Sequence, residues 1–294
     1  MYLGRNHNIE ARHNRKTIAY KDGALALLVW GTAIAITGIF LWIAIDVTWH
    51  GIGQISWEFL TAEPRNSGRD GGSSSILIST GLILGVCLGT AVPLALGTAI
   101  LLAEFTATHN RFGQWVRRSL DMLAGVPSIV FGLFGNAFFS VTLGLGFSIL
   151  SGGLTLACMI LPILIRTIEV GLRSVPDDYR LGAASLGLSR TSTAIHVLLP
   201  SAIPSLVAGV ILGMGRAVAE AAALIFTSGY VDRTPTSLLD SGRSLSIHIY
   251  DLSMNVPGGD RNAYASVLVL LVFLLLANTA AMGLSKLWMH RVMS

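Results

Sequence analysis

Six stretches of this chain consist almost entirely of apolar residues, and each is long enough, or nearly long enough, to cross a lipid bilayer. The hydrocarbon core requires about 20 helical residues, because each residue advances an α-helix by about 1.5 Å. A helix also satisfies its own backbone hydrogen bonds, which lipid cannot do. The sequence therefore predicts an all-α polytopic membrane protein with six transmembrane helices. The runs are 24–45, 76–103, 122–145, 149–165, 202–226 and 263–287, the fourth being short and ending near Pro162.

The composition supports a membrane protein and argues against other classes. Hydrophobic residues make up 52% of the chain and charged residues only 12%, far from the usage of soluble proteins. The net charge of +4 would suit nucleic acid, but only three of the 20 basic residues are lysines and the basic residues lie in short loops. We therefore expect contact with membrane lipid and no nucleic acid. Cys87 and Cys158 lie inside apolar runs and indicate no disulfide framework.

The distribution of basic residues predicts which way the chain crosses the membrane, because cytoplasmic loops carry an excess of Lys and Arg. If the N-terminus is cytoplasmic, fourteen basic residues lie inside and five outside, with Arg216 within a span. We therefore expect a cytoplasmic N-terminal segment at residues 1–23 and one transmembrane domain at residues 24–294. The loop at about 174–200 and the C-terminus are expected to be cytoplasmic as well.

A stretch with polar ends, residues 177–200, separates two of the apolar runs. Ser174 and Asp177 have the spacing of a capping box, Pro176 suits the first turn of a helix, and Gly187 suits its end. The pattern predicts a short helix between two spans. It resembles the EAA loop of ABC-importer permeases, in which Glu-Ala-Ala is followed after three residues by Gly and later by Ile-x-Leu-Pro. Gly187 holds the Gly position, and Val-Leu-Leu-Pro at 197–200 ends the motif.

The match departs from that motif at its first residue. The Glu-Ala-Ala positions hold Leu181, Gly182 and Ala183, so the acidic residue is missing. The resemblance still implies a cytoplasmic coupling helix whose surface docks a separate ATPase. An ordinary amphipathic helix on the membrane surface is the alternative interpretation. The implied contact residues are Asp178, Leu181, Ala183, Ala184, Gly187 and Leu188.

The fifth apolar run contains an arginine and a glutamate four residues apart, Arg216 and Glu220. In a continuous helix this spacing places both side chains on one face. An arginine at the bilayer centre costs at least about 2.5 to 3.5 kcal/mol on insertion scales, so Arg216 should face a polar interior with Glu220 as its nearest candidate partner. A guanidinium there can offer forked donors to a tetrahedral oxyanion. A static salt bridge that holds helices together is the alternative interpretation.

Two segments carry a more specific resemblance. Residues 123–135, Leu-Ala-Gly-Val-Pro-Ser-Ile-Val-Phe-Gly-Leu-Phe-Gly, are similar almost residue for residue to the third-span motif of the permease family of the bacterial phosphate-specific transport system. The residues of the fifth run that match the same family's Arg-x-x-Gly-Glu-Thr-Ala-Pro-Leu-Leu-Phe-Thr segment are Arg216, Glu220, Ala222, Leu224, Phe226 and Thr227. The end of the second run, Ala103-Glu104-Phe105, resembles the family's Ala-Glu-Tyr. The resemblance implies a substrate pathway lined by Arg216, Glu220, Ser128 and Thr227.

That resemblance implies a type I ABC-importer permease of the bacterial inner membrane that forms half of a pathway for phosphate. The implied partners are a homologous second permease, ATP-binding ATPase subunits and an extracytoplasmic phosphate-binding protein, with no cofactor and no metal. The sequence has no Gly-x-x-x-x-Gly-Lys-Ser/Thr loop, so we expect a non-catalytic subunit. An importer of another oxyanion, such as sulfate, molybdate or phosphonate, is the alternative. A membrane enzyme and an assembly subunit are further classes that no motif supports.

Overall fold

The structure is a computed structural model that describes the backbone of residues 4–106 and 110–293, and the side chains of 22, 23, 25–106, 110–283 and 286. Its contacts divide the chain into two units, one ending at His50 and one beginning at Gly51. The first unit consists of helix α1 (Gly4–Gly51), and the stretch Leu25–Gln54 is long and apolar enough to span a membrane. Several residues used for the orientation lie outside the described side chains, namely Arg5, Arg12, Arg15, Lys16, Lys21 and Arg291.

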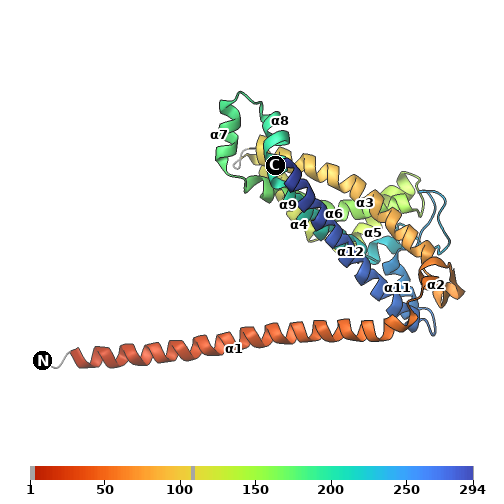
Figure 1. Cartoon of the computed structure of the whole chain (residues 1–294), viewed down its shortest axis with the longest axis horizontal. Coiled ribbons are helices and arrows are strands. Elements are labelled where there is room, and N and C mark those ends of the chain that lie inside the picture. The colour runs from red at the N-terminus through yellow and green to blue at the C-terminus, as the bar shows by residue number, and fades with distance from the viewer. Residues whose placement is uncertain (1–3, 107–109, 294) are drawn as a thin grey trace. The chain divides into compact units, whose positions relative to one another are not determined.

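The second unit is built from helices with one very short pair of strands (Figure 1). Three of its segments, η3, η4 and η5, are π-helical, whereas η1 and η2 are 3₁₀ turns. In chain order the elements are η1 (Ile52–Gln54), α2 (Trp57–Thr61), β1 (Pro64–Arg65), η2 (Asn66–Gly68), β2 (Asp70–Gly71), α3 (Ser74–Ile100), η3 (Leu101–Phe105), α4 (Arg111–Ala124), α5 (Ser128–Gly135), η4 (Asn136–Thr142), α6 (Ile149–Arg173), α7 (Asp177–Ser185), α8 (Arg190–Thr193), η5 (Ala194–Leu198), α9 (Leu199–Val218), α10 (Ala222–Ile225), α11 (Leu245–Met254) and α12 (Asp260–Met293).

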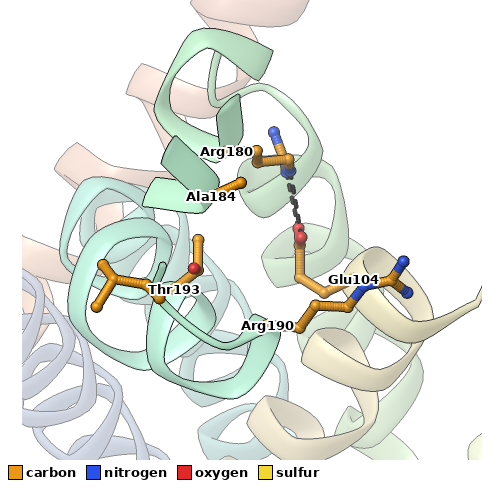
Figure 2. Close-up of a pocket in the computed structure, with 6 residues that line it drawn as sticks. Glu104, Arg180, Ala184, Arg190 and Thr193 are labelled. Carbon is orange, nitrogen blue, oxygen red and sulfur yellow. Dashed lines mark hydrogen bonds and ion pairs between the residues drawn. The ribbon is translucent and has the colours of Figure 1, made fainter. Parts of the chain in front are cut away.

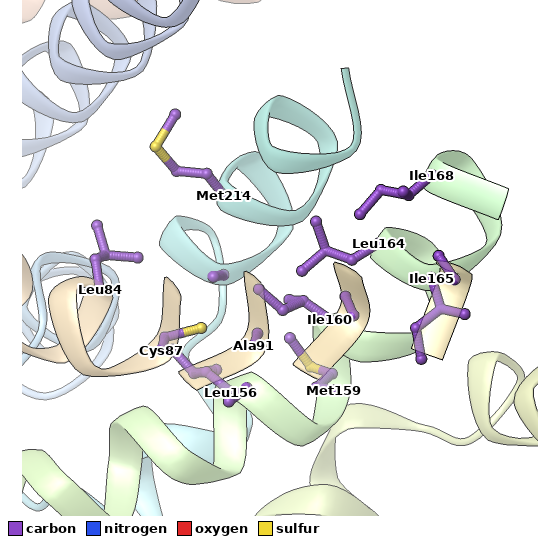
Figure 3. Close-up of a cluster of buried hydrophobic side chains, with 14 of the residues drawn as sticks. Leu84, Cys87, Ala91, Leu156, Met159, Ile160, Leu164, Ile165, Ile168 and Met214 are labelled. Atoms are coloured by element: carbon purple, nitrogen blue, oxygen red, sulfur yellow. The ribbon is translucent and has the colours of Figure 1, made fainter. Parts of the chain in front are cut away.

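The core of this unit lies where α3, α6 and α9 pack together (Figure 3). Residues four apart share one face of a helix, and both α3 and α6 bury such a row. The row on α3 is made of small residues, which allow the two backbones to approach closely in lipid, where apolar burial alone does not drive helices together. The buried rows are Cys87, Ala91, Ala95 and Ala99 on α3, and Leu156, Ile160, Leu164, Ile168 and Leu172 on α6.

The prediction of six apolar spans is confirmed with changes in three of them. Five helices in the described part of the chain are long and apolar enough to cross a membrane, or up to six if one bent pair counts as a span. That pair replaces the predicted run 122–145: Arg111–Ala124 and Ser128–Thr142 meet at an angle of 102°. Gly125 ends α4, and Pro127 cannot continue it because its nitrogen has no hydrogen to donate. The third span is therefore a bent pair of helices that begins earlier than the predicted run.

The fourth and fifth runs have different limits from those predicted. Helix α6 continues to Arg173, with Pro162 inside it, because the charged residues of its last turns are paired and need not leave the helix. The fifth run spans Arg190–Val218 and so begins and ends earlier than 202–226. The chain then leaves the helix before α10. This break decides the geometry around Glu220.

The segments before α3 and before α12 lie at the opposite end of the unit from α7 (Figure 1). Strands β1 and β2 pair antiparallel, with Pro64 opposite Gly71 and Arg65 opposite Asp70, which is a small addition to the all-α prediction. Helix α11 packs against α12 and α3 and buries Leu245, Ile247 and Leu252.

Candidate functional site

The predicted short helix between the spans is α7, and Gly187 closes it. The amide of Gly187 donates to the Ala184 carbonyl and that of Leu188 to the Ala183 carbonyl, at 3.0 Å each. Gly187 has φ +75°, a left-handed conformation that glycine adopts without strain, and the two bonds form a Schellman ending. The predicted end of the helix is therefore confirmed.

The predicted capping box at the start of α7 is wrong. Helix α7 begins at Asp177 after Pro176, and no side chain caps it. Ser174 instead ends α6, where its hydroxyl donates to the Gly171 carbonyl at 2.8 Å. A serine that follows a helix directly finds an unpaired carbonyl closer than the next helix's amides.

Arg180 bonds α7 to the ends of η3 and α6, and Figure 2 shows its ion pair with Glu104 of η3. Its Nη2 and Nε donate to the two carboxylate oxygens of Glu104, in η3, at 2.7 and 3.1 Å. The guanidinium also donates to the carbonyls of Leu172 and Val175 at 3.0 and 2.8 Å. The hydrogen bond that Arg180 donates to Glu104 is the main reason that the pKa of Arg180 is raised from its ordinary value. Movement of α7 is thereby coupled to α3, through η3, and to α6.

No motif in the sequence predicted the ion pair between Arg180 and Glu104. Glu104 appeared only as part of a resemblance, and Arg180 only in the count of basic residues. The one available signal was that a carboxylate at the end of an apolar run requires a cationic partner.

Five of the six predicted coupling residues are exposed, and the sixth, Ala183, is buried. Ala183 is 4% exposed and packs beneath α7, whereas Leu181 and the neighbouring Leu186 are 66% and 82% exposed. The five exposed predicted residues are Asp178, Leu181, Ala184, Gly187 and Leu188. A cavity of about 330 Å³ opens beside them, and Figure 2 shows the side chains around it. Its lining residues are Glu104, Arg180, Ala184, Leu188, Arg190 and Thr193.

Arg216 lines a second cavity, of about 270 Å³, between α4, α6 and α9. Pro162, near the middle of α6, and Arg166, one turn further on, are on the same wall. Arg166 forms a bidentate ion pair with Asp121 of α4, with Nη2 at 2.7 Å from each carboxylate oxygen. Arg216 itself makes no hydrogen bond or ion pair with any residue that the structure describes. Its donors therefore remain available to an anion.

The predicted ion pair between Arg216 and Glu220 is absent among the described residues, so that pairing was wrong. Helix α9 ends at Val218, between the two side chains, so the spacing of four no longer places them on one face. Glu220 instead caps α10, accepting from the Ala223 amide at 3.1 Å, while its carbonyl accepts from the Ser246 hydroxyl at 2.6 Å.

The other two predicted pathway residues lie away from the Arg216 cavity. Ser128 is the half-buried first residue of α5, immediately after the bend at Pro127. Thr227 is fully buried, and its hydroxyl donates to the Ala223 carbonyl at 2.9 Å. The structure thus brings together Arg216, Arg166 and Asp121, of which the sequence singled out only the first. Among the side chains that the structure describes, no three of His, Cys, Asp or Glu gather as a metal site would require.

Comparison with known proteins places the chain in a transport family. Residues 91–293 match the model of the binding-protein-dependent transport system inner membrane component, and the chain belongs to this family. The inward-facing MetNI methionine ABC transporter has a similar fold, with a TM-score of 0.59 over 73% of this chain and 94% of that one, at 14% identity. The protein is therefore a multi-pass inner-membrane permease with the fold of type I ABC importers.

Two relatives are similar over nearly the whole chain. One is the probable ABC transporter permease protein YqgI of Bacillus subtilis, 32% identical over 290 residues, or 93% of this chain and 97% of the relative. The other is the phosphate transport system permease protein PstA 2 of Mycobacterium bovis, 30% identical over 272 residues, or 89% and 88%.

Proposed function

We propose that this chain is the permease subunit of an ATP-driven phosphate importer and forms half of its translocation pathway. The observation that carries the proposal is the Arg216 cavity, where a guanidinium without a partner among the described residues lies with Arg166, one turn beyond the middle of α6. Tetrahedral oxyanions are bound well by such forked donors. The relatives that are named as phosphate transport permeases support phosphate as the cargo.

The proposed partners follow from the family and from α7. A homologous second permease supplies the other half of the pathway, two ATPase subunits bind on the side of α7, and an extracytoplasmic protein delivers phosphate. The termini and α7 are cytoplasmic in this proposal, as the distribution of basic residues favours. Hydrolysis of ATP by the partners moves α7, and the Arg180–Glu104 ion pair transmits that movement to α3.

Phosphate uptake into liposomes that contain the assembled transporter tests the proposal. Arg216→Gln should abolish uptake while the complex still assembles, because Arg216 contributes its charge to passage and has no bonding partner among the described residues. Arg233→Gln is the matched control, since Arg233 is exposed and lies in the segment before α11, away from this cavity. Normal uptake by assembled Arg216→Gln protein would exclude the proposed role. Uptake of sulfate or molybdate in place of phosphate would assign another oxyanion.

A further inference from the structure

A third cavity, of about 400 Å³, lies between α4 and α6 and is unusually rich in arginine. Four of its lining residues carry guanidinium groups and one carries a carboxylate. We call it the α4–α6 arginine cavity. Its polar lining residues are Gln114, Arg117, Arg118, Arg166, Glu169 and Arg173. Neither the motifs in the sequence nor the family comparison assigns a role to it.

Glu169 organises the arginines of this cavity. It is 2% exposed, and its Oε1 accepts from Arg117 Nε at 2.7 Å and from Arg173 Nε at 3.1 Å. The same two arginines donate through Nη2 to the Leu102 carbonyl, at 2.9 and 2.6 Å. Leu102 is in the last turn of its helix, where carbonyl oxygens lack donors from the helix itself. Arg117 and Arg173 are thus held in fixed positions before any ligand arrives.

The positive charge of the cavity exceeds the negative charge that surrounds it. The four guanidiniums of the lining face two negative charges. One is on Glu169, which lines the cavity, and the other is on Asp121, which lies outside the lining but pairs with Arg166. Arg118 makes no hydrogen bond or ion pair with a described residue. Fixed guanidiniums with surplus positive charge and unused N–H donors are suited to bind a phosphate group in several directions at once.

One buried oxygen points to the protonation state of that ligand. Glu169 Oε2 is buried and accepts no hydrogen bond from any described residue; its nearest ionic partner, Arg166 Nη1, is 3.5 Å away. A buried acceptor whose contact is this long is less well satisfied than one that accepts a hydrogen bond. A phosphate group that retains one proton can donate to this oxygen, whereas sulfate has only acceptors near neutral pH. The cavity therefore combines donors for the oxygens of phosphate with an acceptor for its hydroxyl.

We propose that the α4–α6 arginine cavity is a binding site for a proton-bearing phosphate group, either inorganic phosphate or the monoester headgroup of a lipid. Arg166 lines both this cavity and the Arg216 cavity, so an inorganic phosphate bound here stands one step further along the same route. This inference rests on the proposed function only in taking phosphate as cargo. Binding to the purified full-length protein, in nanodiscs of phosphatidylcholine, tests it without any transport step.

The titration uses inorganic phosphate and sulfate as probes, and the Arg216→Gln protein keeps the other cavity from contributing. That protein should bind phosphate, and sulfate at least tenfold more weakly. Adding Arg118→Gln should weaken phosphate binding about tenfold, since Arg118 supports no described contact. Adding Arg233→Gln should change nothing. Glu169→Gln should reduce the preference for phosphate over sulfate, because Oε2 is then lost as a charged acceptor.

Lipids provide the second arm. If phosphatidic acid, a monoester, displaces phosphate and phosphatidylglycerol, a diester without a P–OH group, does not, the site is confirmed and lipid is one source of the ligand. If neither lipid competes, inorganic phosphate alone is the ligand. The proposal is overturned if the Arg216→Gln protein binds no phosphate, if Arg118→Gln binds it as well as its parent does, or if sulfate or phosphatidylglycerol binds equally well. If the Arg216→Gln protein loses uptake but still binds phosphate, the result supports both the transport role of Arg216 and phosphate binding in the α4–α6 arginine cavity. If it keeps uptake but binds no phosphate, both proposals fail.

Discussion

Removing the guanidinium of Arg180 should undock α7 from the rest of the permease. An exposed ion pair stabilises a protein by about 0 to 1 kcal/mol, whereas breaking a buried pair costs about 3 to 5 kcal/mol. The side chains of Arg180 and Glu104 are 25% and 11% exposed, so the pair lies between these cases. We expect Arg180→Gln to shift the equilibrium between docked and undocked α7 by about 2 kcal/mol, or about 30-fold.

Hydrogen exchange over residues 177–188 measures this shift, and phosphate transported per ATP hydrolysed measures its effect on coupling. Arg180→Gln should increase exchange about 30-fold and lower the transport ratio. Arg190→Gln is the matched control, because the Arg190 side chain lines the same cavity but makes no hydrogen bond or ion pair with a described residue. Replacing both Arg180 and Glu104 by Leu should be less harmful than Arg180→Leu alone, since no carboxylate is then left unpaired. Unchanged exchange and coupling in Arg180→Gln would refute the reasoning.

Three other perturbations test separate features of the structure. Gly187→Ala should destabilise the end of α7 by about 1 kcal/mol, seen as faster local hydrogen exchange, because φ at this position is +75°. Gly182→Ala, inside the helix with open space around it, should have the opposite effect and slow exchange, because alanine favours helix over glycine by roughly 0.5 to 1 kcal/mol. Gly135→Leu should lower the thermal unfolding temperature strongly, since even a Cβ there would clash with the hydroxyl of Thr155 in α6. Burial, and next the nearby Arg243, lower the pKa of His248 to about 4 from 6.5. Stability should therefore fall as pH is lowered from about 6.5 to 4, by at most about 3 kcal/mol in total, and His248→Asn should flatten this dependence in a thermal melt; an unchanged slope would contradict it.

The spans were predictable from sequence because hydrophobic length is a property of each segment alone. The bends in the spans were less predictable, because Pro127 permits a break after α4 but its presence does not set the angle between the two helices. The continuation of α6 to Arg173 could not be foreseen, because a span predicted from hydrophobicity ends at the first charged residues. In the structure Glu169 pairs with arginines from α4 and α6, which makes the same charges compatible with a long helix.

The predicted ion pair between Arg216 and Glu220 does not form, because contacts with distant parts of the chain end α9 between them. Alanine favours helix strongly, so Ala217 and Ala219 favour a continuous turn between Arg216 and Glu220. Tertiary contacts prevailed over that preference, because Ser246 holds the Glu220 carbonyl and the carboxylate caps the next helix. The pair of Arg180 and Glu104 was similarly hidden, since 76 residues separate its members.

The π-helical segment η5 fixes the direction in which α7 faces. A π-turn holds one residue more than an α-helical turn, and one residue corresponds to about 100° of rotation about the helix axis. The extra residue in η5 therefore sets the rotation of α8, and of the loop that joins it to α7, about the axis of α9. Deleting one residue within Ala194–Leu198 would restore regular α-helix and swing α8 and the attached loop to another side of the bundle. The chain's length in this one turn, as well as the chemistry of its surface, determines where its exposed leucines are presented.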